Sequence, residues 1–356
     1  MSSTPSSATV PGPSPAGVAD DRLTQVSLLT RLLRRPELGA LLAVVVVGLF
    51  FAVTTEQFLT LDGMADWTSV GATVGIPAVA VALLMIGGEF DLSAGVMIGT
   101  AGLLVGILVT EVGLNVWLAI ALTLAFAAGI GFFNGFVVLR TKLPSFIVTL
   151  ATFFILQGAN LGVTKLITGT VVVSGLEDQP GYSSAHSLLG GTFWAPHDFQ
   201  VTVLWWIAIT VAATWVLSRM RFGNWIFGVG GDVEAARNSG VPVARVKIAL
   251  FMTTAVTSAL TGVMIALRLG STQANQGVGD EFTFIIAAVV GGCLLTGGFG
   301  SAIGAALGAT IVGMAFIGIQ FSGWDTDWRF LFLGVILLIA VLINNFIRRR
   351  AEGARR

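Results

Sequence analysis

Residues 219–247 read RMRFGNWIFGVGGDVEAARNSGVPVARVK and lie between two long apolar runs, near 200–218 and 246–268. A bilayer core about 30 Å thick needs about 20 residues of helix, so each run is long enough to cross it. A polar, glycine-rich and charge-balanced stretch between two such runs belongs outside the hydrocarbon. The sequence therefore predicts a polytopic membrane protein in which residues 219–247 form an exposed surface segment.

This segment contains the pattern of a short capped helix. Asp232 is a good N-cap residue, and we expect a helix over Val233 to Ser239 that Gly240 and Pro242 bring to an end. Gly230 and Gly231 are expected to give the helix a flexible entry. By the positive-inside rule, the flanking basic residues place the segment in the cytoplasm; they are Arg219, Arg221, Arg237, Arg245 and Lys247. Such a helix is suited to docking into a groove of a partner, although an ordinary polar connection between spans is the other interpretation.

Composition excludes a soluble domain, because 55% of the residues are hydrophobic and only 11% are charged, whereas soluble domains have about 25% charged residues. The single cysteine, Cys293, excludes an internal disulfide. The sequence has no P-loop, no nucleophile elbow and no metal-ligand cluster. We therefore expect that this chain is not an enzyme and that it binds no metal and no cofactor. The formal net charge of zero gives no indication of nucleic-acid binding.

Ten apolar stretches predict an all-α polytopic membrane protein with about ten transmembrane helices, near 37–55, 67–87, 93–112, 115–138, 144–166, 200–218, 246–268, 282–296, 300–320 and 328–347. Glycine and polar residues interrupt the second to fourth stretches and the eighth is short, so some spans are expected to be broken or re-entrant. An even number of spans places both termini in the cytoplasm. Of the 19 Lys and Arg residues, only Lys165, Arg268 and Arg329 then face outward.

The chain divides into three predicted parts. Residues 1–36, rich in Ser and Pro, are expected to form a disordered cytoplasmic tail, residues 37–347 the transmembrane domain, and residues 348–356 a basic cytoplasmic tail. The largest outward loop, 168–200, is long enough to fold locally and to meet an external partner. A solvated lid between two spans explains this loop equally well.

The stretch Gly87-Gly88-Glu89-Phe90-Asp91-Leu92-Ser93-Ala94-Gly95 places two carboxylates beside an apolar span. Carboxylates are costly in hydrocarbon, so Glu89 and Asp91 either face water or serve transport. The other interpretation is that Asp91 and Ser93 start the next helix. Polar side chains that are candidates for the path of an uncharged solute are Glu89, Asp91, Ser93, Asn134, Gln157 and Asn160, with Gln273 and Asn275 as further amides.

Glycines at four-residue spacing indicate helix packing. Gly95 and Gly99 lie on the third predicted span, and Gly300, Gly304 and Gly308 on the ninth. Small residues at this spacing allow close contact between helices, so we assign these five positions to packing and not to chemistry.

The run Gly230 to Val243 resembles the cytoplasmic coupling loop of ribose-type permease subunits of ABC sugar importers, and Glu234-Ala235-Ala236 with Gly240 is similar to the core of the wider EAA signature of bacterial importers. Asn224 stands where the sugar-permease pattern usually has Arg, Asp232 where it has Asn, and the Leu-Pro ending of the EAA signature is absent. Three further blocks resemble the same family in order along the chain: Gly88 to Gly95, Asn134-Gly135 with Pro144 to Leu150, and Gly291 to Gly300, where Cys293 and Leu294 replace a Thr-Ser pair.

The resemblance implies the permease subunit of an ABC importer for a sugar or sugar-like polyol, in the bacterial cytoplasmic membrane. It implies three partners: a second permease copy or paralogue, an ATPase subunit with two nucleotide-binding domains that uses the ATP, and an extracytoplasmic sugar-binding protein. The residues that it assigns to the ATPase contact are Gly230, Gly231, Asp232, Glu234, Ala235, Ala236, Arg237, Ser239 and Gly240. A stand-alone secondary transporter or facilitator explains the spans but not the capped helix, and a membrane enzyme or an assembly protein is a weaker alternative.

Overall fold

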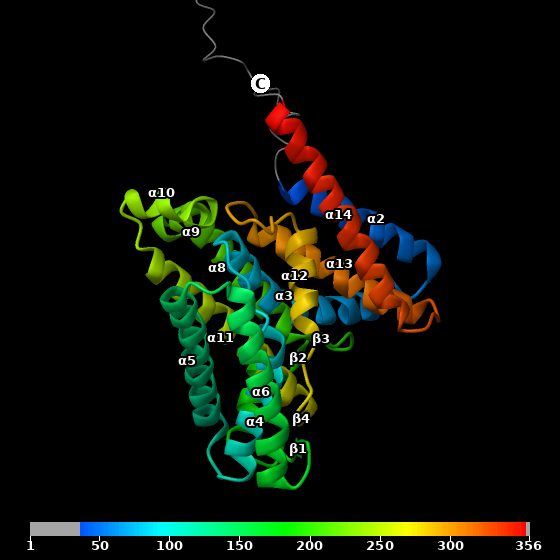
Figure 1. The fold of residues 1–356 in the computed structure, drawn as a ribbon. Coiled ribbons are helices and arrows are strands. Elements are labelled where there is room, and N and C mark those ends of the chain that lie inside the picture. Colours follow the sequence, from blue (N-terminus) through cyan, green and yellow to red (C-terminus); the bar gives the residue numbers. More distant parts are fainter. Residues whose placement is uncertain (1–35, 354–356) are drawn as a thin grey trace, which may run out of the picture. The chain divides into compact units, whose positions relative to one another are not determined.

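The computed structural model describes the backbone of residues 36–353 and the side chains of residues 37–342, so the predicted tail 1–36 lies outside it except for Pro36. This part of the chain is mostly helical and has only short strands (Figure 1). Its elements are α2 (Pro36–Thr54), α3 (Leu61–Ile86), α4 (Ala94–Thr110), α5 (Val116–Thr141), α6 (Ser145–Thr168), β1 (Val172–Ser174), α7 (Tyr182–Ala185), the π-helical turn η2 (His186–Gly190), β2 (Thr192–Phe193), β3 (Phe199–Gln200), α8 (Val201–Arg219), α9 (Arg221–Gly231), α10 (Val233–Asn238), α11 (Val243–Leu269), β4 (Ser271–Gln273), α12 (Asp280–Val290), α13 (Ala302–Phe321) and α14 (Trp328–Gly353).

Among the described residues, 7 helices are long and apolar enough to cross a membrane: α2, α3, α5, α6, α8, α11 and α13. Each of the ten predicted stretches holds a helix, but three of these helices fall outside that group. α4 has 17 residues, the apolar part of α14 within the searched residues is Trp328–Leu342, and α12 has only 11 residues. The mostly helical architecture with several candidate membrane spans is therefore confirmed, and the count of ten crossings stays a prediction.

Local sequence signals explain where the long helices begin and end. The Thr60 hydroxyl accepts a hydrogen bond from the amide of Gly63 at the start of α3, and the Asn115 side chain accepts one from the amide of Trp117 at the start of α5. Gly169 and Gly270 adopt the left-handed conformation directly after α6 and α11, which is the usual way for a glycine to end a helix.

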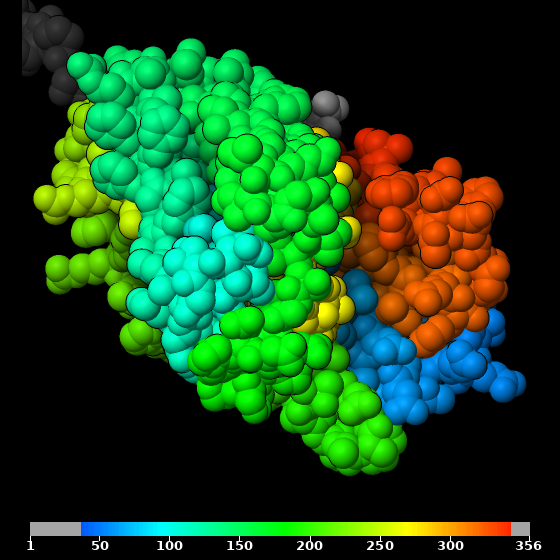
Figure 2. Space-filling view, turned by 90° about the horizontal axis from the view of Figure 1, so that it is seen from below, coloured from blue at the N-terminus to red at the C-terminus, as the bar shows by residue number. Residues whose placement is uncertain are grey.

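α5 and α6 form much of one outer face of residues 36–353, and Figure 2 shows them there in teal and green. Only 33% of the most apolar stretch of each helix is buried. Large apolar side chains on their outer sides, including Phe132, Phe136, Phe154 and Ile155, are exposed. Such a contiguous apolar surface is stable only when something apolar covers it, and lipid tails do so for a membrane protein.

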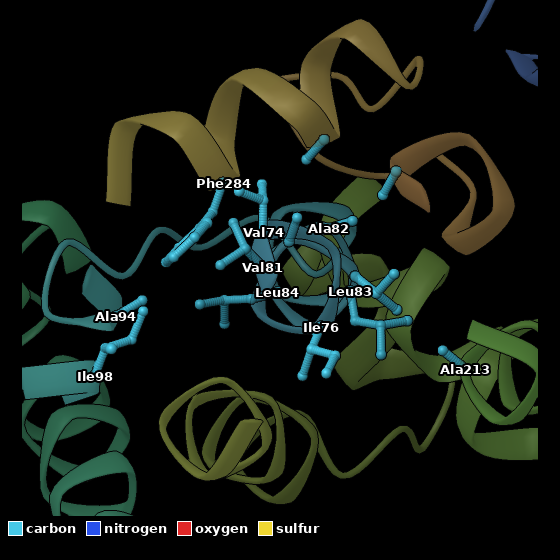
Figure 3. Close-up of a cluster of buried hydrophobic side chains, with 14 of the residues drawn as sticks. Val74, Ile76, Val81, Ala82, Leu83, Leu84, Ala94, Ile98, Ala213 and Phe284 are labelled. Atoms are coloured by element: carbon cyan, nitrogen blue, oxygen red, sulfur yellow. The ribbon is translucent and has the colours of Figure 1, made fainter. Parts of the chain in front are cut away.

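α3 is the central helix of the bundle, because 83% of its most apolar stretch is buried. It packs against α8, α11, α12 and α13. Figure 3 shows its apolar side chains surrounded by Phe284 of α12, Ala94 and Ile98 of α4, and Ala213 of α8. Pro77 lies inside α3, yet the helix is continuous over 26 residues, so the interruption that was expected in this stretch is absent.

Residues 168–200 fold locally against the end of α11. β1 pairs with β4 in antiparallel register, with Val172 opposite Gln273, and β2 pairs with β3. Between these two small sheets, the hydroxyl of Tyr182 donates a 2.6 Å hydrogen bond to the carbonyl of Leu267. The loop is therefore a folded element, and its contact with an external partner stays a prediction.

Two expected boundaries differ from the structure. α14 continues to Gly353, so the helix extends into the predicted basic tail 348–356, of which residues 354–356 lie outside the described residues. α13 begins at Ala302, so Gly300 precedes this helix and does not lie on it. A side chain on Gly300 would approach the Sγ atom of Cys293 to 2.6 Å, which shows that this glycine belongs to the turn between α12 and α13.

Candidate functional site

The segment 219–247 contains one helix that sequence reasoning missed, α9. Its apolar residues Phe222, Trp225, Ile226 and Val229 follow the i, i+3, i+4, i+7 spacing of an amphipathic helix. Ile226 and Val229 are buried, and Phe222 and Trp225 are half-buried. The signal was therefore present in the sequence, although the polar and glycine residues between these positions obscured it.

The prediction that Gly230 and Gly231 form a flexible entry is wrong, because both are the last residues of α9. A Cβ atom on Gly230 would overlap the carbonyl oxygen of Ile86 at the end of α3 and lie 2.7 Å from the amide nitrogen of Gly298. Nothing lies within 4 Å of the same position on Gly231. The chain thus enters α10 from a packed helix end.

The predicted cap of α10 is confirmed. The Oδ1 atom of Asp232 accepts hydrogen bonds from the amides of Glu234 at 2.9 Å and Ala235 at 3.0 Å. At the other end, Gly240 adopts φ of +82°, which glycine allows at no steric cost, and Pro242 directly precedes α11. α10 is therefore a single short helix whose two ends are fixed by its own sequence.

α10 presents a charged outer face. Arg237 Nη1 lies 2.9 Å from Glu234 Oε1, and the two side chains are 60% and 72% exposed. Ala236 is buried on the opposite side of the helix. A one-turn helix with a paired cation and anion on its free side can contact a protein groove by charge as well as by shape.

The turn between α3 and α4, residues 87–93, is attached to α6 by its backbone. The amide of Phe90 donates to Ser145 Oγ and the amide of Leu92 donates to Thr149 Oγ1, each at 3.0 Å. Both hydroxyl groups lie on the first two turns of α6. Two backbone donors that have no helical partner are thus satisfied by side chains of a neighbouring helix.

A buried chain of hydrogen bonds runs from this turn into α5 and α6. Asp91 Oδ1 accepts from the amide of Ser93 at 2.9 Å and from its hydroxyl at 2.6 Å. Asn134 Nδ2 donates to Ser93 Oγ at 3.1 Å, and Thr152 Oγ1 donates to Asn134 Oδ1 at 2.6 Å. All four side chains are buried. Asp91 thus orders the turn directly before α4, whereas Ser93, the N-cap residue of α4, makes no capping hydrogen bond with its side chain. The network also gives Asn134 a structural role.

Glu89 forms an ion pair with Lys247, which lies on the first turns of α11. The side chains of Glu89 and Lys247 are 9% and 13% exposed, so the pair is largely shielded from water. Lys247 is also the last residue of the segment 219–247. The ion pair therefore joins the turn 87–93 to the chain that follows α10.

The remaining polar candidates lie apart from this network. Asn160 is buried on the α6 face that also carries Thr149 and Thr152, and its Nδ2 atom has no hydrogen-bond partner among the described residues. Gln157 is half-buried on the same helix. Gln273 is exposed and pairs with β1 through its backbone, and Asn275 is exposed in the chain that follows β4. The structure thus brings Asp91, Ser93 and Asn134 together, pairs Glu89 with Lys247, and leaves the other four amides separate.

The packing glycines meet two different neighbours. Side chains on Gly304 and Gly308 would overlap the carbonyl oxygens of Gly291 and Ala287, so α13 closely approaches α12 and the residue that ends it. A Cβ on Gly95 would overlap the Oε2 atom of Glu281 in the first turn of α12 and lie 2.6 Å from the carbonyl oxygen of Gly277, and one on Gly99 would lie 2.5 Å from that of Gln276. This side of α4 therefore packs against the start of α12 at Gly95, as helix-to-helix contact, and against the irregular chain before α12 at Gly99.

No group of three or more His, Cys, Asp or Glu side chains within the described residues is placed to hold a metal ion. Cys293 is buried and free.

The chain is similar in sequence to known proteins. Residues 63–341 match a family model described as branched-chain amino acid transport system / permease component. The chain is similar to the xylose transport system permease protein XylH of Escherichia coli strain K12, with 30% identity over 87% of this chain and 91% of that protein. It is 29% identical to the ribose import permease protein RbsC of the same strain, over 87% and 94%, and 31% identical to the fructose import permease protein FrcC of Rhizobium meliloti, over 79% and 77%. No solved structure matches the chain.

Proposed function

This chain belongs to the branched-chain amino acid transport system permease component family, and from that membership we propose that it is the membrane-spanning permease subunit of an ABC importer that moves a sugar or sugar-like polyol. Three relatives that it matches over most of its length are named as permeases for xylose, ribose and fructose. The single structural observation that carries the assignment is α10, an exposed helix capped at both ends and set directly before α11.

We propose further that the chain crosses a bacterial cytoplasmic membrane ten times, with both termini and the segment 219–247 on the cytoplasmic side. Seven long apolar helices support multiple crossings. The distribution of Lys and Arg supports the orientation, because it places only Lys165, Arg268 and Arg329 outward. On this topology α4 and α12 are the short helices of broken spans, and residues 168–200 lie on the outer side.

The partners that follow from this function are an ATPase subunit with two nucleotide-binding domains, a second copy of the chain or a related permease, and an extracytoplasmic sugar-binding protein. The ATPase binds and hydrolyses the ATP. α10 is the part of the chain that docks to it, because Glu234 and Arg237 are exposed while Ala236 anchors the helix from below. The folded loop 168–200 is the element suited to receive the binding protein.

Transport then proceeds by alternating access. Closure of the ATPase draws its two docked α10 helices together, and the helices attached to them move as rigid units. Asn160 and its neighbour on α6, Gln157, are the side chains that we propose for contact with the solute. The buried Nδ2 atom of Asn160 has no partner among the described residues, and the half-buried Gln157 is a second amide, so both can offer the hydrogen bonds that an uncharged sugar needs. Glu89, Asp91, Ser93 and Asn134 shape the turn beside this path.

The test is to purify the tagged chain from its native membrane in mild detergent and to identify the proteins that accompany it. We expect an ATPase with two nucleotide-binding domains, and we expect the double variant Glu234→Arg/Arg237→Glu to lose it together with uptake while still inserting in the membrane. The matched control is Glu111→Arg, which reverses an exposed charge at the far end of α4. If the wild-type chain purified alone while its cells imported solute without ATP, the chain would instead be a stand-alone facilitator.

A further inference from the structure

α3 and α12 end in the same way. The amides of Gly87 and Gly88 donate to the carbonyls of Leu83 and Met85, and the amides of Gly291 and Gly292 donate to those of Ala287 and Val289, all at 2.9 to 3.0 Å. The next residue completes the motif in both turns, because Glu89 bonds back to Leu84 and Cys293 to Ala288. Gly88 and Gly292 adopt φ of +84° and +94°. The chain therefore contains two equivalent helix-ending turns, each leading into a further helix.

Both turns meet the end of α9, the first at Gly230 and the second at the backbones of Gly230 and Gly231. The amide of Gly298, in the second turn, donates a 2.8 Å hydrogen bond to the carbonyl of Ile86, in the first. A Cβ on Gly297 would lie 2.7 Å from the carbonyl oxygen of Gly230 and 2.9 Å from the Cα of Gly88. We call this contact of Ile86–Gly88, Gly230 and Gly297–Gly298 the glycine junction. Three backbones approach so closely there that no side chain fits between them.

The junction leaves no room for a side chain on Gly230 but leaves room for one on its neighbour. A Cβ on Gly230 would overlap the carbonyl oxygen of Ile86, whereas one on Gly231 meets nothing within 4 Å. Both residues belong to α9 and both have ordinary helical backbone dihedrals, so alanine is intrinsically acceptable at either. The two positions differ in the contact that a side chain would make with the turns.

Each turn leads to a different part of the bundle. The first turn passes into α4 and is attached to α6, while the second passes into α13, which packs on α2 and α3. Backbone contacts without side chains between them transmit displacement directly, because close-packed atoms resist compression. A movement of α9 must therefore be felt by both turns at once.

We propose that the glycine junction is the positioning element through which displacement of α9 and α10 moves the ends of α3 and α12 together. The inference rests on the proposed function, because it assigns α10 to the ATPase contact. The inference adds the route by which a movement at the ATPase contact reaches the membrane-spanning helices. Gly230 is then a positioning residue that acts through the two turns and does not touch the solute.

The experiment compares Gly230→Ala with its matched control Gly228→Ala in the complex reconstituted in liposomes. Gly228 lies on the same helix outside the residues assigned to the ATPase contact, and a Cβ atom there meets only the Cβ atom of Ala236, at 3.9 Å. We expect both variants to retain the ATPase within about twofold. Gly230→Ala should reduce uptake at least tenfold while ATP hydrolysis continues, whereas Gly228→Ala should keep wild-type uptake per ATP hydrolysed. Equal uptake per ATP in the two variants would overturn the inference. Loss of the ATPase from the wild-type chain would instead overturn the proposed function.

A second measurement uses the wild-type complex, so it stands even if Gly230→Ala fails to insert. Hydrogen–deuterium exchange is followed in peptides covering residues 84–93 and 289–300, with and without a non-hydrolysable ATP analogue. We expect the exchange rates of the two peptides to change together when the analogue binds, and the amide of Gly298 to be among those that respond. A response of one turn without the other would contradict the shared junction.

Discussion

The ion pair between Glu89 and Lys247 gives the sharpest quantitative test of the site. The variant Lys247→Met removes the cation and leaves Glu89 charged at a position where its side chain is only 9% exposed. Removing one partner from a buried ion pair costs about 3–5 kcal/mol, because the remaining charge is left without compensation. Lys247 itself keeps 13% exposure, so water reaches part of the pair, and we expect a loss near the lower limit, about 3 kcal/mol.

We expect a second mutation, Glu89→Gln, to restore most of the lost stability. In the double variant Glu89→Gln/Lys247→Met no charge is left to be desolvated, and its free energy of unfolding should lie within about 1 kcal/mol of the wild type. The assay is a double-mutant cycle on the purified chain in micelles, in which unfolding by SDS is followed through tryptophan fluorescence. The cycle should give an interaction energy of about 2 kcal/mol or more.

The Glu234 and Arg237 pair is the built-in control for this cycle. Its atoms are 2.9 Å apart, but the side chains are 72% and 60% exposed, so the same cycle should give at most about 0.5 kcal/mol. If the two pairs gave equal interaction energies, burial would not be what distinguishes them. Additive losses at Glu89 and Lys247 would refute the claim that these two residues stabilise the structure as a pair.

Two further predictions concern the ends and the interior of the site. Asp232→Ala removes both hydrogen bonds of the α10 cap and should cost about 1 kcal/mol in helix stability, so the amount of ATPase that purifies with the chain should fall several-fold. Asp232→Asn keeps a good cap residue and should retain the ATPase. Equal retention by the two variants would contradict the role of the cap. Asn134→Leu removes two buried hydrogen bonds, from Asn134 to Ser93 and from Thr152 to Asn134, although Ser93 keeps its bond to Asp91 and Thr152 its bond to the carbonyl of Val148. It should lower stability by about 1–3 kcal/mol, measured as a lower thermal midpoint in detergent. Gln157→Leu is its control, because Gln157 makes no side-chain hydrogen bond within the described residues, and a comparable loss there would contradict the network argument.

Features that depend on neighbouring residues could be predicted from the sequence. The cap of α10 is formed between Asp232 and the amides two and three residues later, so the residue types at those positions were sufficient to locate it. The long helices were equally accessible, because an apolar run of 20 residues has few other stable structures in a membrane protein. α9 fell between these two cases, since its apolar spacing was present but is interrupted by glycines.

Features that depend on distant residues could not be predicted. Glu89 and Lys247 are 158 positions apart, and nothing in the composition of either stretch indicates their contact. Glu89 and Asp91 were grouped as neighbouring carboxylates, yet the irregular turn directs one toward α11 and the other toward its own helix start. Side-chain directions in such a turn follow no period, so sequence spacing does not reveal them.

The packing glycines show the same limit. The spacing of Gly95 and Gly99 correctly indicated a side of α4 that accommodates a close neighbour, but spacing carries no information about what that neighbour is. The structure supplies the first turn of α12 together with the irregular chain before it, and that chain has backbone groups that a helix would have satisfied internally. Its partners are set by tertiary packing alone.

The cap at Asp232 also marks a boundary for protein engineering. On its C-terminal side, both ends of α10 are fixed by residues 232–240 themselves and Ala236 packs beneath the helix, whereas Gly230 on the other side is fitted to two turns from distant parts of the chain. A graft of residues 232–240 from a relative therefore brings a complete helix and leaves the recipient's backbone contacts unchanged. A graft that begins even two residues earlier must also keep glycine at position 230, because a Cβ atom there would overlap the carbonyl oxygen of Ile86.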